Sequence, residues 1–276
     1  MKILVTGANG YIGTGVVKQL LDDGMEVVAT DYTTEKIDSR AKVIGCDIFK
    51  IKGAYTLFEE PDALLHLAWR DGFKHNSINH INDLPYHYSF INELINDGLK
   101  KVCVLGSMHE IGFFEGSINE FTPTNPQSLY GIAKNALRGA VELAAKNKTL
   151  FQWIRGYYIV GNTENGCSIF SKIVQAEKEG KTTFPFTMGE NQFDFIDYNV
   201  FCNQVAKVVE QNKVLGIINC CSGRPSRLSE RVERFISENK YKIKLQYGAF
   251  SERPYDSKAV WGNTEKIDAI LASSSR

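Results

Sequence analysis

The feature that most restricts how this chain of 276 residues can fold is its first strand and the glycine-rich turn after it. Residues 2–6 form a short apolar run that is typical of a buried parallel strand. Glycines at positions 7, 10 and 13 follow, and a helical pattern covers about 11–23. Strand, glycine-rich turn and helix in this order predict a site where a diphosphate rests on a helix N-terminus.

Each glycine has its own steric reason in such a turn. Gly7 allows the tight turn, Gly10 the approach of a pyrophosphate, and Gly13 the close packing of helix on strand. A second predicted strand, over 25–30, ends in Asp31, roughly 20 residues beyond the glycines. A carboxylate there accepts hydrogen bonds from ribose hydroxyls and repels a 2′-phosphate, which favours NAD as the cofactor.

NADP stays open as the alternative cofactor. Lys36 and Arg40 follow the second strand closely enough to approach a 2′-phosphate. On the residues alone, a glycine turn with an incidental acid is the remaining interpretation.

Further apolar runs alternate with helical patterns, which predicts a doubly wound parallel sheet of the Rossmann type. The predicted strands lie at about 41–47, 62–68, 101–106, 151–155 and 216–223, and the predicted helices at 81–97, 128–147, 200–212 and 226–238. The alternation loosens after residue 160. We therefore expect an NAD(P)-binding domain over 1–160, with 193–222 packing back onto it, and a smaller α/β substrate lobe from 161–192 and 223–276.

Tyr130 and Lys134 lie four residues apart in the helix predicted over 128–147, so they share one helix face. An ammonium beside a phenol favours the phenolate and lowers the phenol pKa from its usual value of about 10. A general acid/base needs such a pKa. Taken alone, the pair equally fits an exposed amphipathic face.

The pattern Thr-Gly-x-x-Gly-x-x-Gly at 6–13 and the Tyr-x-x-x-Lys at 130–134 resemble the short-chain dehydrogenase/reductase superfamily. Its extended branch contains nucleotide-sugar epimerases, dehydratases and 4-ketoreductases. Asp47-Ile48 resembles the pair that cradles adenine there, and His66-Leu67-Ala68 resembles its His-x-Ala at the cofactor. The resemblance implies cofactor contacts at Gly7, Asn9, Gly10, Tyr11, Ile12, Gly13, Asp31, Asp47, Ile48, Leu67, Ala68, Tyr130 and Lys134.

Ser107 ends the fifth predicted strand and precedes Gly112 by five residues, as the serine of the family's triad does. The resemblance implies that Ser107 holds the substrate oxygen, Tyr130 transfers its proton, and Lys134 lowers the tyrosine pKa and binds the nicotinamide ribose. Met108 and His109 stand where the dehydratases carry an acid and a base, which disfavours water elimination.

His109 also lies where fucose-synthase-like members keep a proton-transferring cysteine. Two roles stay open for it. Its imidazole can act as an acid or base near neutral pH. Alternatively, it only hydrogen-bonds Glu110 or the substrate.

Substrate contacts are expected after the fourth strand, because ligands of open α/β sheets bind at strand C-termini. Arg70, His75 and Asn76 are the candidates there, although solvation of a polar loop explains them equally well. Tyr158 is a further candidate, at a position where the family has an asparagine. Phe193 replaces the arginine that commonly binds the diphosphate, which leaves Arg253 for that task.

The resemblance implies an NAD(P)-dependent oxidoreductase that acts at C4 of a nucleoside-diphosphate (4-keto-)6-deoxyhexose. The alternative is a C4 epimerase with tightly held NAD, similar to UDP-glucose 4-epimerase. A non-catalytic dinucleotide sensor ranks below both, because it does not need the triad. The family also implies a homodimer formed through the helix that carries Tyr130.

Composition restricts the classes of partner and the cellular compartment that we expect for this protein. The 32 basic and 32 acidic residues give zero formal net charge, which argues against a nucleic-acid binder. No apolar run reaches the roughly 18 residues of a membrane span. The six cysteines lack C-x-x-C spacing, so we expect no metal site and free thiols in the cytoplasm.

Overall fold

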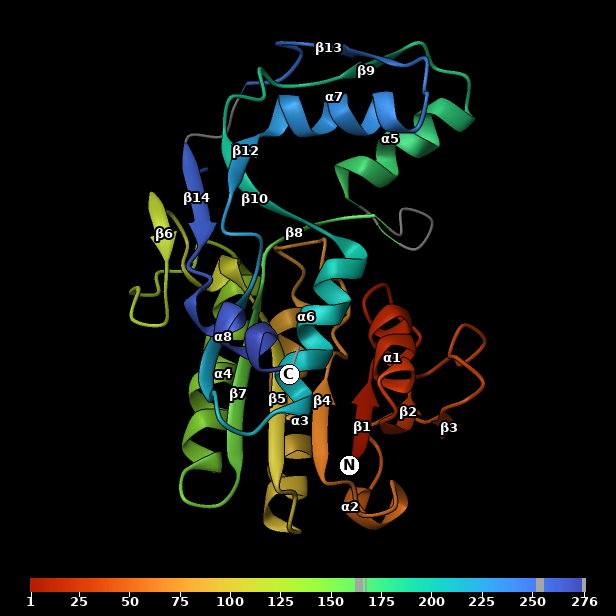
Figure 1. Cartoon of the computed structure of the whole chain (residues 1–276), viewed down its shortest axis with the longest axis vertical. Helices are drawn as coiled ribbons and strands as arrows, with labels where there is room; N and C mark the ends of the chain where they lie inside the picture. The colour runs from red at the N-terminus through yellow and green to blue at the C-terminus, as the bar shows by residue number, and fades with distance from the viewer. Residues whose placement is uncertain (162–165, 167, 252–255, 275–276) are drawn as a thin grey trace.

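The computed structural model describes residues 1–161, 166, 168–251 and 256–274, and its centre is a seven-stranded parallel sheet (Figure 1). The strand order is β11-β7-β5-β4-β1-β2-β3. The bounds are β1 Lys2–Thr6, β2 Glu26–Thr30, β3 Lys42–Val43, β4 Ala63–His66, β5 Lys101–Ser107, β7 Leu150–Gly156 and β11 Gly216–Cys220. The order reverses direction between β1 and β4, and ligands of such sheets bind at this switch point.

The Rossmann-type sheet is confirmed, but the strand predicted at 41–47 is wrong in length. Only Lys42–Val43 pairs with β2. The next residues continue with single bonds, from Ile44 N–H to Ala29 O and from Cys46 N–H to Asp31 O. A longer ladder cannot form because β2 ends at Thr30.

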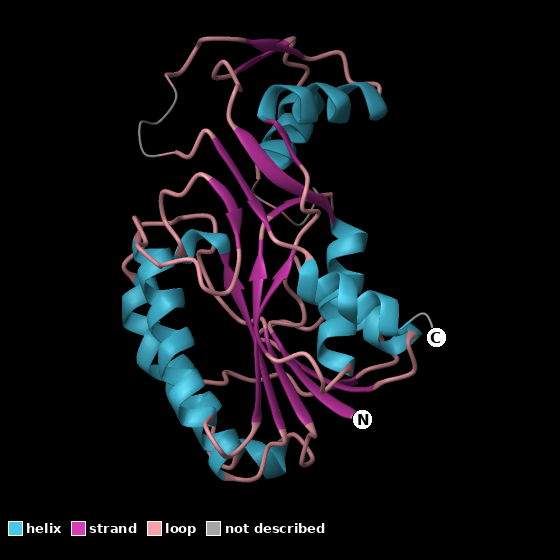
Figure 2. Ribbon diagram, turned by 60° about the vertical axis from the view of Figure 1, so that its left-hand side comes forward, coloured by secondary structure: helices cyan, strands magenta, loops and turns pink. Residues whose placement is uncertain are grey.

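Helices cover both faces of the large sheet (Figures 1 and 2). One face carries α1 (Gly13–Asp22), α6 (Tyr198–Glu210) and α8 (Glu265–Ser274), and the other α2 (Ala54–Leu57), α3 (Asn79–Asn96) and α4 (Leu129–Ala145). Ile3 and Val5 pack in the core of the first face and Leu4 in that of the second. Side chains alternate along a strand, so a strand covered on both faces is apolar throughout.

A second, smaller sheet lies beyond the C-terminal ends of the large one (Figure 1). Its order is β12-β10-β14-β6, and β8 also pairs with β10. The bounds are β6 Gly116–Ile118, β8 Tyr158–Val160, β10 Gln192–Asp197, β12 Pro225–Arg227 and β14 Ala259–Gly262. Helices α5 (Ile169–Lys178) and α7 (Leu228–Glu238) and the strand pair β9 (Thr183–Pro185) and β13 (Lys244–Gln246) complete this end.

The two sheets exchange elements across residue 160. Strands β6 and β8 end at or before that residue and join the small sheet, whereas α8 lies near the C-terminus and packs on α6 and β11. The buried side chain of Asp194 in β10 connects the small sheet to the loop that follows β11 of the large sheet. Its carboxylate accepts bonds from Ser222 N–H and hydroxyl, Gly223 N–H and Gly262 N–H, at 2.6–3.0 Å.

None of the helices in the described ranges is long and apolar enough to cross a membrane.

Candidate active site

The glycine-rich turn follows β1 at the switch point of the sheet. Gly7 adopts φ +69°, and a Cβ there would lie 2.6 Å from the backbone nitrogen of Ala68. A Cβ on Gly13 would collide with the carbonyl oxygen of Gly7. At Gly10 the nearest atom to a built Cβ is 3.2 Å away. The outer glycines are therefore required by packing within the protein, whereas at Gly10 the only close atom among the described residues is the Gly7 carbonyl oxygen.

Asp31 stands at the C-terminal end of β2 beside this turn. Its carboxylate accepts hydrogen bonds from Asn9 N–H at 3.0 Å and from Tyr32 N–H at 2.8 Å. The amide of Asn9 in turn bonds Thr33 Oγ1 and Lys36 N–H, both at 2.7 Å. The turn and the end of β2 are thereby held together as one unit.

The other predicted cofactor residues surround this unit. Leu67 N–H donates to Thr6 O at 3.1 Å, which sets Leu67 and Ala68 directly against the turn. Asp47 accepts from the hydroxyl of Tyr32 at 3.0 Å, and its neighbour Ile48 is buried.

Arg40, which is with Lys36 one of the two alternative ligands for a 2′-phosphate, is engaged elsewhere. Its guanidinium pairs with Asp22 at 2.8 Å and Asp38 at 2.7 Å.

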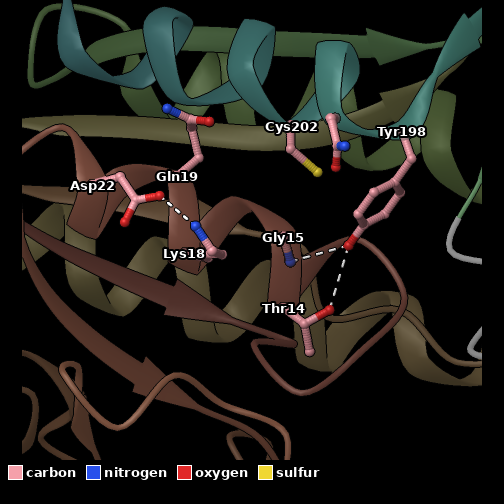
Figure 3. A pocket seen from close by; sticks show the side chains of 8 residues that line it. Thr14, Gly15, Lys18, Gln19, Asp22, Tyr198 and Cys202 are labelled. Carbon is pink, nitrogen blue, oxygen red and sulfur yellow. Dashed lines mark hydrogen bonds and ion pairs between the residues drawn. The ribbon is translucent and has the colours of Figure 1, made fainter.

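Tyr11 and Ile12 lead into α1, and Tyr198 of α6 contacts the start of this helix at Thr14 and Gly15 (Figure 3). The hydroxyl of Tyr198 donates to Tyr11 O at 2.7 Å and accepts from Gly15 N–H at 3.0 Å. The Tyr11 hydroxyl donates to Gly161 O at 2.9 Å. Between α1 and α6 lies a surface cavity of about 600 Å³, lined by Thr14, Gly15, Lys18, Gln19, Asp22, Tyr198, Asn199 and Cys202. None of the predicted catalytic residues lines it, so we assign it no catalytic role.

The predicted triad comes together where β5 ends and α4 begins. Ser107 is the last residue of β5, and the Ser128 hydroxyl caps α4 by accepting from Gly131 N–H at 3.2 Å. The Ser107 side chain hydrogen-bonds that of Tyr130. Lys134 is 1% exposed; its Nζ donates to Leu105 O at 2.7 Å and lies 3.8 Å from the centre of the Trp69 ring.

Burial dominates the electrostatics of this pair. It raises the pKa of Tyr130 to about 12, against the opposing effect of the Ser107 hydrogen bond. It lowers the pKa of Lys134 to about 7, against the effect of the Glu110 carboxylate. The sequence predicts that Lys134 lowers the pKa of the Tyr130 phenol, and the structure does not show this effect. The ammonium lies 6.0 Å from the Tyr130 ring centre and points at Leu105 O and Trp69.

All five histidines of the chain gather around this site. The ring of His75 stacks on that of Tyr130 at 5.5 Å, and the ring of His109 lies 4.4 Å from His75. Burial, with His75 beside it, lowers the pKa of His109 to about 3, so its imidazole is neutral near pH 7.

The other three histidines line the back of the site. His66 Nε2 bonds His87 Nδ1 at 2.8 Å, and Trp69 Nε1–H donates to His80 Nδ1 at 3.0 Å. Burial lowers the pKa of His66 to about 3, and the ring lies within the protein core rather than acting as a catalyst. Sequence reasoning missed His80 and His87. Their spacing of seven on one face of α3 was the available signal.

The loop after β4 is tied to the helices beside it. His75 O accepts from Tyr130 N–H at 2.9 Å, and Asn76 Oδ1 accepts from Leu129 N–H at 3.3 Å. The Arg70 guanidinium forms a two-point ion pair with Asp83 of α3. Arg70 and Asn76 therefore anchor the loop, and His75 alone of the three candidates touches Tyr130.

The small sheet supplies the facing wall. The ring of Tyr158 lies 4.5 Å from Phe193 and 6.3 Å from His109. Aromatic surface thus stands where the family pattern has an asparagine and an arginine. Arg253 lies outside the described residues. Among those that are described, no group of three histidine, cysteine or acidic side chains is arranged to hold a metal.

Comparisons with known proteins agree with this architecture. The model of the NAD-dependent epimerase/dehydratase family matches residues 3–221. A dTDP-6-deoxy-L-talose 4-dehydrogenase (NAD⁺) from Aggregatibacter actinomycetemcomitans is 43% identical over 269 residues, which cover 95% of this chain and 99% of that one.

Solved structures extend the agreement in fold. A UDP-glucose 4-epimerase superimposes with a TM-score of 0.86 at 18% identity, over 99% of this chain and 92% of its own. A UDP-glucuronic acid 4-epimerase from Bacillus cereus, in complex with UDP-glucuronic acid and NAD, gives 0.79 at 20% identity, over 99% and 93%.

Proposed function

Because the chain belongs to the NAD-dependent epimerase/dehydratase family, we propose that it is an NAD-dependent dehydrogenase acting at C4 of a nucleoside-diphosphate 6-deoxyhexose. The observation that carries the proposal is the meeting of Ser107, Tyr130 and Lys134 beside the glycine-rich turn. The 43% identical relative, a dTDP-6-deoxy-L-talose 4-dehydrogenase, supports this choice over the epimerase alternative.

The residues at the turn fit the cofactor. The open backbone at Gly10 suits a diphosphate at the N-terminus of α1, and Asp31 suits the adenosine ribose hydroxyls. Arg40 is held by two carboxylates, which supports NAD over NADP. When bound, NAD⁺ accepts the hydride that leaves C4 of the sugar.

Tyr130 takes the O4 proton during oxidation and returns it during reduction. The Ser107 hydroxyl, hydrogen-bonded to the phenol, orients O4 toward it. Lys134 is buried with its ammonium 6.0 Å from the centre of the phenol ring, and it would bind the nicotinamide ribose of the cofactor. The raised pKa of Tyr130 favours the protonated phenol, which is the form that donates to a keto oxygen. Oxidation therefore gains from high pH and reduction from lower pH.

The facing wall suits the sugar. Tyr158 and Phe193 offer apolar contact for the methyl group of a 6-deoxyhexose. We assign the substrate lobe to the small sheet with α5, α7, β9 and β13. The lobe takes in β6, β8 and β10, and it excludes α8, which packs on α6 and β11. Neutral His109, near both Tyr130 and Tyr158, is placed to hydrogen-bond the sugar, and Arg253 remains the candidate for its diphosphate.

We also propose a cytoplasmic homodimer. The described cysteines are free, in keeping with a reducing compartment. Ile132 and Leu143 on α4 are exposed apolar side chains, at 44% and 75%, in keeping with an interface on that helix. Light scattering coupled to size exclusion measures the oligomeric state.

The test of function is a panel of dTDP-, UDP- and GDP-linked 6-deoxyhexoses with NAD⁺ or NADP⁺, read by absorbance and by mass spectrometry of products. We expect NADH formation and a 4-keto product about 2 Da lighter than the substrate, because the sugar loses a hydride and a proton. Stoichiometric retained NAD with isomerised sugar and no net NADH would instead identify an epimerase. No turnover across the panel, with Tyr130→Phe identical to wild type, would overturn both.

A further inference from the structure

We propose that Glu110 is a positioning residue of the active site: its buried carboxylate fixes Ser107 at the end of β5 and places a negative charge behind it. The proposal rests on the proposed function, since it concerns the same triad. It assigns a task to a residue that touches neither the substrate nor the cofactor.

The contacts of Glu110 lead directly to Ser107. Glu110 is 0% exposed and ends the short 3-10 turn Met108–Glu110 that follows β5. Its Oε1 accepts from Ser107 N–H at 2.6 Å, while Ser107 Oγ accepts from His109 N–H at 3.2 Å. This reciprocal capping box sets the backbone of Ser107 and orients its hydroxyl. With one lone pair of Oγ engaged, the hydroxyl hydrogen remains for Tyr130 or the substrate oxygen.

Burial raises the pKa of the Glu110 carboxyl, but the groups in contact with it are hydrogen-bond donors and a guanidinium, which favour the carboxylate form. Besides Ser107 N–H, the indole N–H of Trp153 reaches both oxygens, at 2.9 and 3.0 Å. Arg155 Nη2 lies 3.7 Å from Oε2, and both of these side chains are 0% exposed. A carboxylic acid proton would meet no acceptor here, whereas a carboxylate uses all of these donors.

The local sequence makes room for this carboxylate. A Cβ on Gly106 would collide with both Trp153 Nε1 and Glu110 Oε1. Any side chain at this position would push the acid away from Ser107. Gly106 is therefore required by its contact with Trp153 of β7, which lies 47 positions further along the chain.

The charge of Glu110 acts on the catalytic pair through space. It raises the pKa of Lys134, opposing burial, and it raises the pKa of Tyr130. The charged and titratable groups that face it are Arg155 and Tyr157 from the end of β7, and Lys134 and Tyr130 from α4. Arg155 is the counter-ion that allows the acid to stay charged in the core. Lys134 keeps more of its charge than its burial alone would permit.

Two substitutions separate the two tasks. Glu110→Gln keeps the size and an acceptor for Ser107 N–H but removes the charge. Glu110→Asp keeps the charge but withdraws the carboxylate from Ser107. We measure the pKa of Lys134 in the cofactor-free protein by NMR of ¹³C-labelled lysine, with Lys134→Met to assign the signal, and we measure kcat and KM.

Glu110→Gln should lower the Lys134 pKa by about one unit or more and flatten the pH dependence of kcat. Glu110→Asp should leave that pKa within about half a unit, yet lower kcat roughly 10-fold with KM little changed. An unchanged Lys134 pKa in Glu110→Gln overturns the electrostatic task, and an unchanged kcat in Glu110→Asp overturns the positioning task.

The NMR titration needs no substrate, so it separates this proposal from the proposed function. A wild-type protein without turnover contradicts the function, whereas the Lys134 titration still decides the role of the charge. If Glu110→Gln does not fold, the two single variants Trp153→Phe and Glu110→Asp test the electrostatic task instead. Both keep the charge and should keep the Lys134 pKa near that of wild type, and a fall of one unit in both would overturn the proposal.

Discussion

The large-sheet wall of the proposed active site (Asp31, Ser107, Tyr130 and Lys134) and the small-sheet wall (Tyr158 and Phe193) hold their side chains differently. On the large-sheet wall, backbone groups bind the functional atoms: Asn9 N–H binds Asp31, and Leu105 O binds Lys134. On the small-sheet wall, Tyr158 and Phe193 meet through rings 4.5 Å apart. Hydrogen bonds impose direction, whereas apolar packing is non-directional. We infer that the first wall sets the reaction and the second selects the sugar.

Removing one hydroxyl from each wall should give the largest difference in kcat between the two walls. Tyr130→Phe should lower kcat by roughly 10³-fold, because the group that transfers the O4 proton is lost. Tyr158→Phe, the matched control, should change kcat by less than about 3-fold. Steady-state NADH formation measures both. Similar losses in the two variants would show that the walls do not divide the work in this way.

Lys134→Met tests the cost of a buried cation on the large-sheet wall. We expect kcat to fall by about 10²-fold while the free energy of unfolding at pH 7 rises by about 1 kcal/mol or more. The folded-state pKa of Lys134, about 7, lies below the ordinary 10.5. The unfolded chain therefore binds more protons between these values, and wild-type stability rises with pH across that window.

Urea unfolding of both proteins at pH 7 and pH 9 measures this effect. The variant should lack the part of the pH dependence that Lys134 contributes. A variant that is less stable at pH 7 and retains the full dependence would contradict the assigned burial of the charge.

Asp31→Asn tests the part of the large-sheet wall that is proposed to bind the cofactor. Asn9 N–H and Tyr32 N–H bond different oxygens of the Asp31 carboxylate, so the amide keeps an acceptor for only one of them and loses the charge that binds ribose hydroxyls. We expect KM for NAD⁺ to rise about 10-fold and the preference for NAD⁺ over NADP⁺ to decrease. Arg40→Ala, the control, should leave that preference unchanged, because Asp22 and Asp38 already hold Arg40. A loss of NADP⁺ use in Arg40→Ala would contradict this.

Phe193→Leu carries the smallest expected effect and tests the small-sheet wall. A leucine keeps apolar volume but loses the ring contact with Tyr158. KM for the nucleotide sugar should rise roughly 5-fold with kcat within about 2-fold of wild type, since packing binds substrate and transition state alike. A fall in kcat without a change in KM would move Phe193 to the catalytic side of the comparison.

The large sheet was predictable from sequence because its strands are long enough to carry a pattern. Runs such as those of β1 and β5 are apolar throughout, and glycines and helix caps separate them from the helices. The small sheet was not predictable, because β6, β8 and β12 have three residues each. Three residues show no periodicity, and pairing partners such as β6 and β14 lie more than a hundred positions apart.

Within the site, the outcome depended on whether a property was local. His80 and His87 escaped prediction because a histidine on a helix face does not reveal what packs on it. Glu110 escaped because its partners, Trp153 and Arg155, lie on another strand. The roles of the predicted site residues stay predictions that the substitutions above can decide.

The sequence by itself determined the glycine-rich turn, the acid at Asp31 and the spacing of Tyr130 and Lys134. These depend on backbone geometry over a few residues, where glycine conformations and helical periodicity act. Only the tertiary structure decided the direction of the two pKa shifts, the buried Glu110 behind Ser107, and the aromatic wall at Tyr158 and Phe193. Burial and long-range contacts set these properties, and both arise when distant strands and helices pack together.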